Sequence, residues 1–257
     1  MTLYYKNIPI SYADIGTGET IVLLHGFLEN QKMWDFFCNK FQNSFRIITI
    51  DLLGHGQTPA LAYVHTMREN AQMVAMVLKA LQIEKYSLIG HSMGGYVALE
   101  LAKIHTSQVQ KLVLLNSTSL ADSAEKKLNR DRAILAVKKD YETFVRLSIA
   151  NLFCEDNRIR LASDIEKTKL EALQTPVQGI VASLEGMKVR QDHSKFFRLL
   201  PIPKLFILGT KDAVLPFEQT SQQVINSDIQ LASLSYGHMS HLENKVEVLG
   251  ILSKFFE

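Results

Sequence analysis

The chain has 257 residues, 47% of them hydrophobic, which is enough for one large α/β domain or for a domain that carries an insertion. Its formal net charge is +2 and it has no long run of like charge, so neither nucleic acid nor an anionic membrane is expected as a partner. No apolar segment approaches the roughly 20 residues that span a bilayer.

The first residues lack the basic and apolar regions of a signal peptide, and we expect a cytoplasmic protein. Cys38 and Cys154 are too few for a disulfide framework and are not spaced as a metal site, so both are expected to be small core residues. These features leave the oligomeric state open.

The predicted elements alternate between strands and helices along most of the chain. Short stretches around Tyr4 and Ile10–Tyr12 indicate an opening hairpin. Later segments have apolar residues in unbroken runs, as in strands that are buried on both faces. These segments are Thr20–Gly26, Phe45–Asp51, Tyr86–Ser92, Val109–Ser117, Lys204–Thr210 and the weaker, partly alternating Ile229–Gly237.

Helical patterns lie between these strands. The best runs from Met67 to Leu81, with Thr66 and Glu69 placed as a capping box at its start. Strands that alternate with helices predict βαβ units, a parallel sheet and right-handed crossovers.

One region breaks the alternation, because residues 119–198 contain amphipathic helical pieces and no convincing strand. So long a stretch of helix between two strands is more than a crossover. We therefore expect a helical cap at 119–198, inserted between a first core segment at 1–118 and a second at 199–257.

The stretch Gly90-His91-Ser92-Met93-Gly94 fits G-x-S-x-G and lies between a predicted strand and a predicted helix. Its glycines permit a turn sharp enough to project Ser92 above the sheet. A serine at the start of a helix is well placed to attack a carbonyl carbon, with the N–H of Met93 facing the oxyanion. The alternative is an ordinary glycine-rich turn with a capping serine.

A serine nucleophile needs a base, and the base needs a group that orients it. Asp212 follows one buried strand and His238 follows the last, which gives the order Ser, Asp, His that is typical of this strand–turn–helix motif. Asp122 is the reserve candidate for the acid, and His241 competes with His238 as the base.

The segment "LLHGFLEN" supplies the second oxyanion donor, for which the backbone N–H of Phe27 is the candidate. We expect the His25 side chain to brace this turn rather than react. In "DLLGHGQT", Asp51 and His55 are expected to hydrogen-bond the backbone of their own turn.

With these motifs the chain resembles the α/β-hydrolase superfamily over nearly its whole length. "HGF", "DLLGHGQT", "GHSMGG", "GTKDAVLP" and "GHMSHLE" are similar to that family's signatures in order and spacing. The resemblance implies a mostly parallel eight-stranded sheet, a cap at about 119–198 and a Ser-His-Asp triad. Many members continue from the histidine as in His238 to Glu243, which favours His238 over His241. Thr58 departs conservatively from the serine of many relatives.

The resemblance also bears on the activity. Haloalkane dehalogenases and epoxide hydrolases of this fold carry an aspartate where this chain has Ser92. A carboxylesterase acting on small to medium uncharged acyl esters is expected, with no metal or organic cofactor. The alternatives are a carbon–carbon bond hydrolase of vinylogous diketones, a menaquinone-pathway lyase, a cofactor-free perhydrolase or a binding protein without turnover.

Two residues are interpreted as substrate contacts. Trp34 follows the oxyanion turn and is a candidate for lining the pocket, although it could equally pack its helix on the sheet. His91 precedes the nucleophile, where the carbon–carbon bond hydrolases usually carry asparagine.

Overall fold

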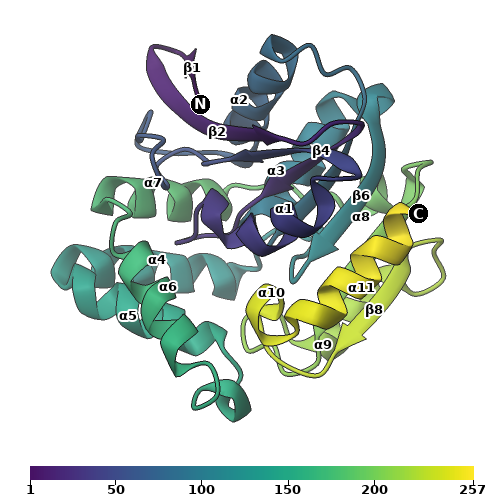
Figure 1. Ribbon diagram of the computed structural model, residues 1–257. Coiled ribbons are helices and arrows are strands. Elements are labelled where there is room, and N and C mark those ends of the chain that lie inside the picture. The colour runs from purple at the N-terminus through teal and green to yellow at the C-terminus, as the bar shows by residue number, and fades with distance from the viewer.

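The computed structural model describes all residues from 1 to 257 and is built on one eight-stranded sheet in the order β1-β2-β4-β3-β5-β6-β7-β8 (Figure 1). The strands are β1 Thr2–Tyr5, β2 Ile8–Ile15, β3 Glu19–Leu24, β4 Phe45–Ile50, β5 Tyr86–His91, β6 Val109–Leu115, β7 Lys204–Gly209 and β8 Gln230–Leu234. Strand β2 pairs antiparallel with β1 and β4, and every other pair is parallel. The predicted hairpin and the mostly parallel sheet are confirmed.

The register aligns the carboxyl ends of the central strands. Leu24 of β3 lies opposite Gly90 of β5, and His91 lies opposite Leu115 of β6. Farther along, Gly209 of β7 lies opposite Leu234 of β8. Residues that follow these strand ends therefore gather along one edge of the sheet.

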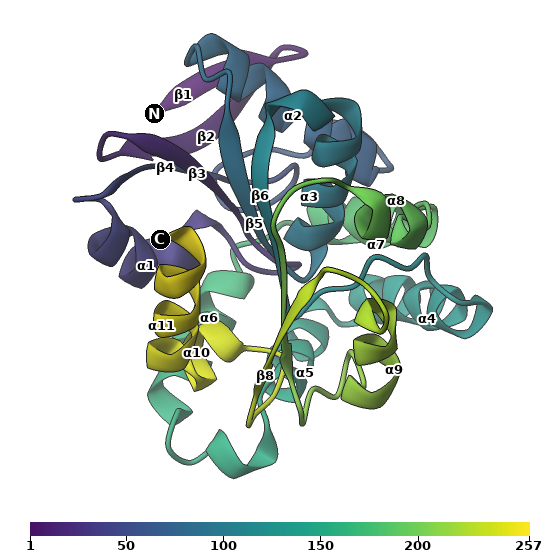
Figure 2. The same cartoon turned by 90° about the vertical axis from the view of Figure 1, so that its right-hand side faces the viewer.

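Helices cover both faces of the sheet, with α1 and α11 on one side and α2 and α3 on the other (Figure 2). The helices are α1 Asp35–Phe41, α2 Met67–Ala80, α3 Met93–Ile104, α4 Ala124–Lys139, α5 Tyr141–Leu152, α6 Ala162–Ala172, α7 Val177–Lys188, α8 Ser194–Leu199, α9 Phe217–Ser221, α10 Ser240–Glu243 and α11 Lys245–Phe256. Single 3₁₀ turns are η1 Gln31–Trp34, η2 Thr106–Gln108, η3 Glu155–Asn157 and η4 Gln222–Val224. No helix is both long and apolar enough to cross a membrane.

Helix α2 begins where the sequence predicts, but its capping box forms only in part. The Thr66 hydroxyl accepts a hydrogen bond from the Glu69 N–H at 3.0 Å, as expected of an N-cap. The Glu69 carboxylate does not return to the cap. It accepts from the Tyr5 hydroxyl at 2.7 Å and pairs with Lys6 at 2.8 Å, and so attaches β1 to the helix.

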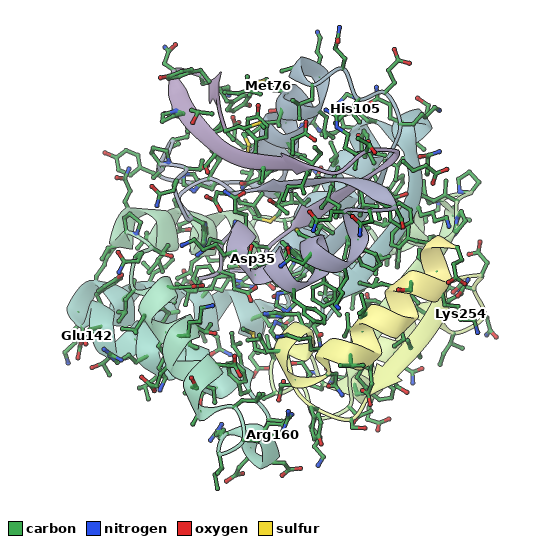
Figure 3. All side chains as sticks on the ribbon, in the orientation of Figure 1. Asp35, Met76, His105, Glu142, Arg160 and Lys254 are labelled. Atoms are coloured by element: carbon green, nitrogen blue, oxygen red, sulfur yellow. The ribbon has the colours of Figure 1, made fainter.

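Residues 119–198, called the helical insertion from here on, hold α4 to α7 and most of α8 between β6 and β7. Figure 3 places Glu142 and Arg160 of the insertion far from Met76 and His105, which lie toward the opposite end of the molecule.

Within the insertion, α7 packs directly on the loop before α2. A Cβ on Gly179 would lie 2.1 Å from the Gly54 carbonyl oxygen, and one on Gly186 would lie 1.8 Å from that of His65. The His65 N–H also donates to the Ala182 carbonyl at 2.9 Å. Glycines seven residues apart on one helix thus bring α7 into backbone contact with the core.

Candidate active site

The turn between β5 and α3 holds Ser92 in a conformation that few side chains adopt. Its φ and ψ are 48° and −114°, in the left-handed half of the backbone map where non-glycine residues are strained. Glycines make the turn possible. A Cβ on Gly90 would lie 2.4 Å from the Gly94 carbonyl oxygen, and one on Gly94 would lie 2.2 Å from that of Leu24. The strained turn presents the partly exposed Ser92 side chain at the end of β5.

Ser92, His238 and Asp212 form a continuous hydrogen-bonded chain. The Ser92 hydroxyl lies 2.9 Å from Nε2 of His238, and Nδ1 of the same ring lies 2.7 Å from Oδ2 of Asp212. Because the Asp212 carboxylate accepts at Nδ1, Nε2 is left as the acceptor for the hydroxyl proton. The histidine and the aspartate are buried, and the serine is partly exposed.

Both oxygens of the Asp212 carboxylate accept hydrogen bonds. Its Oδ1 accepts from the N–H groups of Val214 at 2.8 Å and Leu215 at 2.9 Å, while Oδ2 also accepts from the Asn116 amide at 3.2 Å. Burial alone would raise the pKa of Asp212, but His238 and the N–H groups of Leu215 and Val214 lower it, which keeps the carboxylate ionised.

Asn116 does not appear among the residues singled out from the sequence. Its amide bonds both Asp212 and the Gly237 carbonyl, each at 3.2 Å, and so links the two loops that carry the acid and the base. The available signal was its position directly after the buried strand β6, where polar side chains collect at the sheet edge.

Two backbone N–H groups, in the turns after β5 and β3, have no protein acceptor. Met93 is the first residue of α3, so its N–H has no acceptor within the helix, and the N–H of Phe27 in the turn after β3 donates to no protein group. As expected, His25 braces this turn. Its Nδ1 donates to the Gly26 carbonyl at 2.7 Å and its Nε2 accepts from the Leu52 N–H at 2.9 Å. Burial lowers the pKa of His25, in keeping with this neutral tautomer.

Residues 19–245 match the family described as alpha/beta hydrolase fold. The chain belongs to the α/β-hydrolase family. A solved thermophilic esterase from Thermogutta terrifontis is 29% identical with a TM-score of 0.92, over 99% of this chain and 96% of that one.

Two curated proteins extend the comparison for this α/β hydrolase. The Bacillus subtilis putative 2-succinyl-6-hydroxy-2,4-cyclohexadiene-1-carboxylate synthase is 29% identical, over 96% of this chain and 94% of its own. The Yersinia enterocolitica putative carbamate hydrolase RutD is 26% identical, over 92% and 87%. These names cover different reactions, so family membership leaves the substrate of this α/β hydrolase open.

The reserve candidates for acid and base lie in other environments in this α/β hydrolase. Asp122 pairs with Arg130 and, at 2.6 Å, with Arg190, all within the insertion. His241 is buried with its Nε2 at 3.4 Å from Glu29, and burial lowers its pKa to about 3.

The side chains interpreted as substrate contacts are both interior. Trp34 has no exposed surface and packs against Phe37 in the apolar layer that contains α1 and α11. Of the two interpretations of Trp34, packing on the sheet is therefore the one observed. His91 is 1% exposed, and its ring nitrogens contact Glu29 and the backbone of His238. Neither side chain is open to a substrate in this arrangement.

Asp51 and His55 hydrogen-bond the backbone of the turn after β4, as predicted. Asp51 accepts from the N–H groups of Gln57 at 2.9 Å and Gln31 at 2.8 Å, and the His55 ring contacts the Leu53 carbonyl at 3.1 Å. The turn carries no reacting group.

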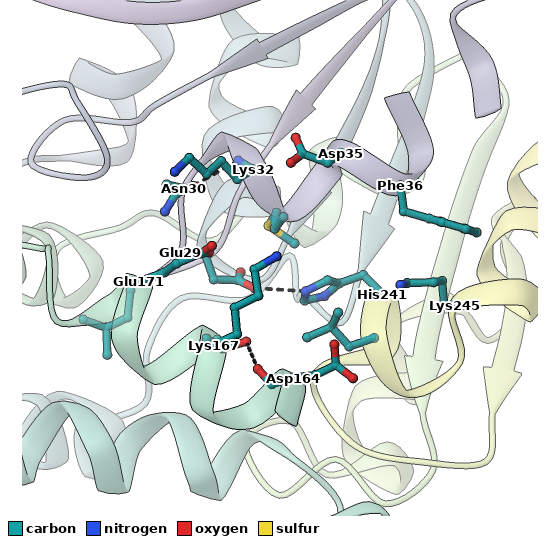
Figure 4. Close-up of a pocket in the computed structure, with 14 residues that line it drawn as sticks. Glu29, Asn30, Lys32, Asp35, Phe36, Asp164, Lys167, Glu171, His241 and Lys245 are labelled. Carbon is teal, nitrogen blue, oxygen red and sulfur yellow. Dashed lines mark hydrogen bonds and ion pairs between the residues drawn. The ribbon is translucent and has the colours of Figure 1, made fainter. Parts of the chain in front are cut away.

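Glu29, His91 and His241 are the residues that come nearest to a metal-binding set, since their ligand atoms all lie within 4.8 Å of one another. Glu29 and His241 also line a pocket between η1, α6 and α10 (Figure 4). However, Nδ1 of His91 lies 2.7 Å from Glu29 Oε2, a separation that holds a shared proton. Its other nitrogen faces a carbonyl oxygen, so the ring has no lone pair free for a cation.

Proposed function

We propose that this α/β hydrolase is a serine hydrolase that cleaves carboxylic esters through an acyl-enzyme. The observation that carries the proposal is the unbroken chain from the Ser92 hydroxyl through His238 to Asp212, at 2.9 Å and 2.7 Å. A binding protein would need no base in contact with its strained serine.

The reaction follows from the donors and acceptors of the site. His238 takes the proton of Ser92 as the hydroxyl oxygen attacks the acyl carbon, and Asp212 stabilises the imidazolium that forms. The N–H groups of Phe27 and Met93 donate to the oxyanion, and losing one such donor costs about 3–4 kcal/mol. His238 then protonates the departing alcohol and activates the water that releases the acid.

We expect an uncharged acyl group of small to medium size. Phe27 carries one of the proposed oxyanion N–H groups, the Leu152 carbonyl accepts from the His238 N–H, and both side chains are partly buried apolar groups. The solved Thermogutta terrifontis protein is named an esterase, which supports an ester as the substrate.

The test is hydrolysis of p-nitrophenyl esters with acyl chains from acetate to palmitate. We expect turnover that peaks at one chain length and is abolished by Ser92→Ala in a folded protein. Ser107→Ala is the matched control, because Ser107 is exposed on η2 before β6. Wild-type rates in Ser92→Ala would refute the role of the serine. If the protein hydrolyses no ester but cleaves a vinylogous diketone, the proposed ester substrate is wrong and the enzyme is a carbon–carbon bond hydrolase.

A further inference from the structure

The His91 ring is buried between two hydrogen-bond acceptors. Its Nδ1 lies 2.7 Å from Oε2 of Glu29, and its Nε2 lies 3.0 Å from the backbone carbonyl oxygen of His238. A carbonyl oxygen cannot donate, so Nε2 carries a proton. A second proton lies between Nδ1 and Glu29, and its position decides whether this buried pair is ionic or neutral.

Two features place that second proton on His91. Imidazole is intrinsically more basic than a carboxylate, with ordinary pKa values of about 6.5 and 4.3. In addition, Glu29 Oε2 accepts from the Gly26 N–H at 2.9 Å, and a donor of this kind stabilises the ionised carboxylate.

The pair also touches all three segments that form the candidate active site. His91 immediately precedes Ser92 at the end of β5, and it donates to the backbone of His238. Glu29 accepts from Gly26, the residue before the oxyanion donor Phe27. The relative placement of nucleophile, base and oxyanion turn therefore depends on two buried side chains.

We propose that His91 is a permanent imidazolium paired with Glu29, and that this pair is the positioning device that holds the His238 loop and the Phe27 turn in register with Ser92. The proposal rests on the serine hydrolase function proposed above. His91 and Glu29 act through their neighbours and are positioning residues.

The surrounding charges agree with the ionic form. Burial alone would lower the pKa of His91, but Glu29 and, to a smaller extent, Asp212 raise it overall. Burial would raise the pKa of Glu29, yet that pKa is lowered overall, with His91 as the largest opposing cause.

The other rings in contact do not compete for the proton. The ring of His241 is 5.1 Å from that of His91, but burial lowers its pKa to about 3, and Lys245 beyond it acts in the same direction. The ring of His238 lies at 5.2 Å, and its two nitrogens already contact Asp212 and Ser92.

Nuclear magnetic resonance of ¹⁵N-histidine-labelled protein tests the charge state without any substrate. At pH 8 we expect one of the eight histidines to carry protons on both ring nitrogens. Its signals should vanish in His91→Gln and persist in His105→Gln, a partly exposed ring at the far end of the molecule (Figure 3). A His91 ring with a single proton at pH 8, or loss of its Nδ1 proton on addition of zinc chloride, would overturn the proposal.

Kinetics test the positioning role. In His91→Gln we expect kcat/KM for the preferred ester to fall at least about tenfold, since small displacements of reacting groups carry large rate losses. The acidic limb of the pH profile should move to higher pH by about one unit, because Glu29 is left without its cation near His238. His105→Gln should leave both unchanged.

A second variant keeps this test decisive if His91→Gln does not fold. Glu29→Gln keeps the imidazole but removes its counter-ion, so the NMR signature of the doubly protonated ring should be lost at pH 8. The double variant with both glutamines restores a neutral pair, and its acidic limb should return toward the wild-type position. An unshifted limb in a folded His91→Gln enzyme would refute the positioning role. A protein with no ester turnover but a doubly protonated His91 would refute only the proposed function.

Discussion

The carboxylate of Glu243 accepts a hydrogen bond from the backbone N–H of Cys154 at 2.8 Å, which joins the helical insertion to the loop that carries the candidate base. The same carboxylate accepts from Gly237 and Met239, on either side of His238, each at 3.1 Å. The His238 N–H donates in turn to the Leu152 carbonyl at 3.0 Å. The position of the base is therefore set partly by the insertion.

Glu243→Gln should lower both stability and turnover, because the amide turns one acceptor into a donor that faces N–H groups. Leaving buried donors unpaired costs about 1–3 kcal/mol each. We expect a lower urea midpoint and a fall in kcat with the preferred ester. Glu218→Gln on α9, where the glutamate is exposed, is the control and should change neither. A Glu243→Gln enzyme with wild-type kcat would show that the insertion does not position His238.

Asp212→Asn should lower kcat by about 10⁴-fold, because an amide cannot stabilise the imidazolium and favours the wrong tautomer. Asp122→Asn should behave differently, since its carboxylate pairs with Arg130 and Arg190 within the insertion. Breaking a buried ion pair costs about 3–5 kcal/mol, so this variant should lose stability without a comparable loss of kcat. Equal kcat losses in two folded variants would contradict the assignment of the acid.

Acid should destabilise the protein well before its carboxylates titrate. Burial lowers the pKa of His55 and of His241 to about 3 and that of His65 to about 4, whereas unfolded histidines titrate near pH 6.5. Below pH 6.5 the unfolded chain binds more protons, and each such group removes about 1.4 kcal/mol per pH unit.

Urea unfolding at pH 8, 7, 6 and 5 measures this effect, and the free energy of unfolding should fall from pH 7 to pH 5. In His55→Gln the free energy of unfolding should depend less steeply on pH, by the equivalent of about one proton taken up on unfolding. His105→Gln should have the same pH dependence as wild type. A free energy that does not change between pH 7 and pH 5 would contradict the buried neutral state of these rings.

Gly186→Ala should destabilise the protein by roughly 1–3 kcal/mol, since the new Cβ would lie 1.8 Å from the His65 carbonyl oxygen. Gly250→Ala in α11 is the matched control, because its Cβ would meet nothing within 4 Å. Alanine there should stabilise the helix by roughly 0.5–1 kcal/mol. Thermal melts of both variants give the comparison, and equal shifts of the same sign would show that α7 does not need its glycine.

The sequence identifies the residues whose chemistry has a local signal. Ser92 lies within a five-residue motif, and each predicted strand that precedes a site residue is found within a few residues of its observed bounds. Strands β3, β5 and β7 could be predicted because parallel strands buried on both faces appear as unbroken apolar runs, whereas the largely exposed β8 has a weaker, alternating pattern.

The supporting residues could not be found in this way. Glu29 and His91 are 62 residues apart, and Asn116 and Asp212 are 96 apart, so their pairing depends on the register of the folded sheet. Trp34 shows the same limit, because an aromatic residue after the oxyanion turn faces either a pocket or the core, and only the direction of α1 decides between them.

The contact between α7 and the core bears on how the insertion can be exchanged among relatives. Gly54 and Gly179 meet backbone to backbone, so a side chain at either position would force α7 away from the loop. A graft of the whole insertion would bring in a foreign α7 that no longer matches the 54–65 loop. A graft that ends before Pro176, at the start of α7, leaves that contact intact. Such a graft would still replace Asp131 of α4, which pairs with Lys188 of α7, and Cys154, which bonds the Glu243 carboxylate beside the His238 loop. For chimeric enzymes, the insertion in this chain is therefore exchangeable only together with its partners in the core.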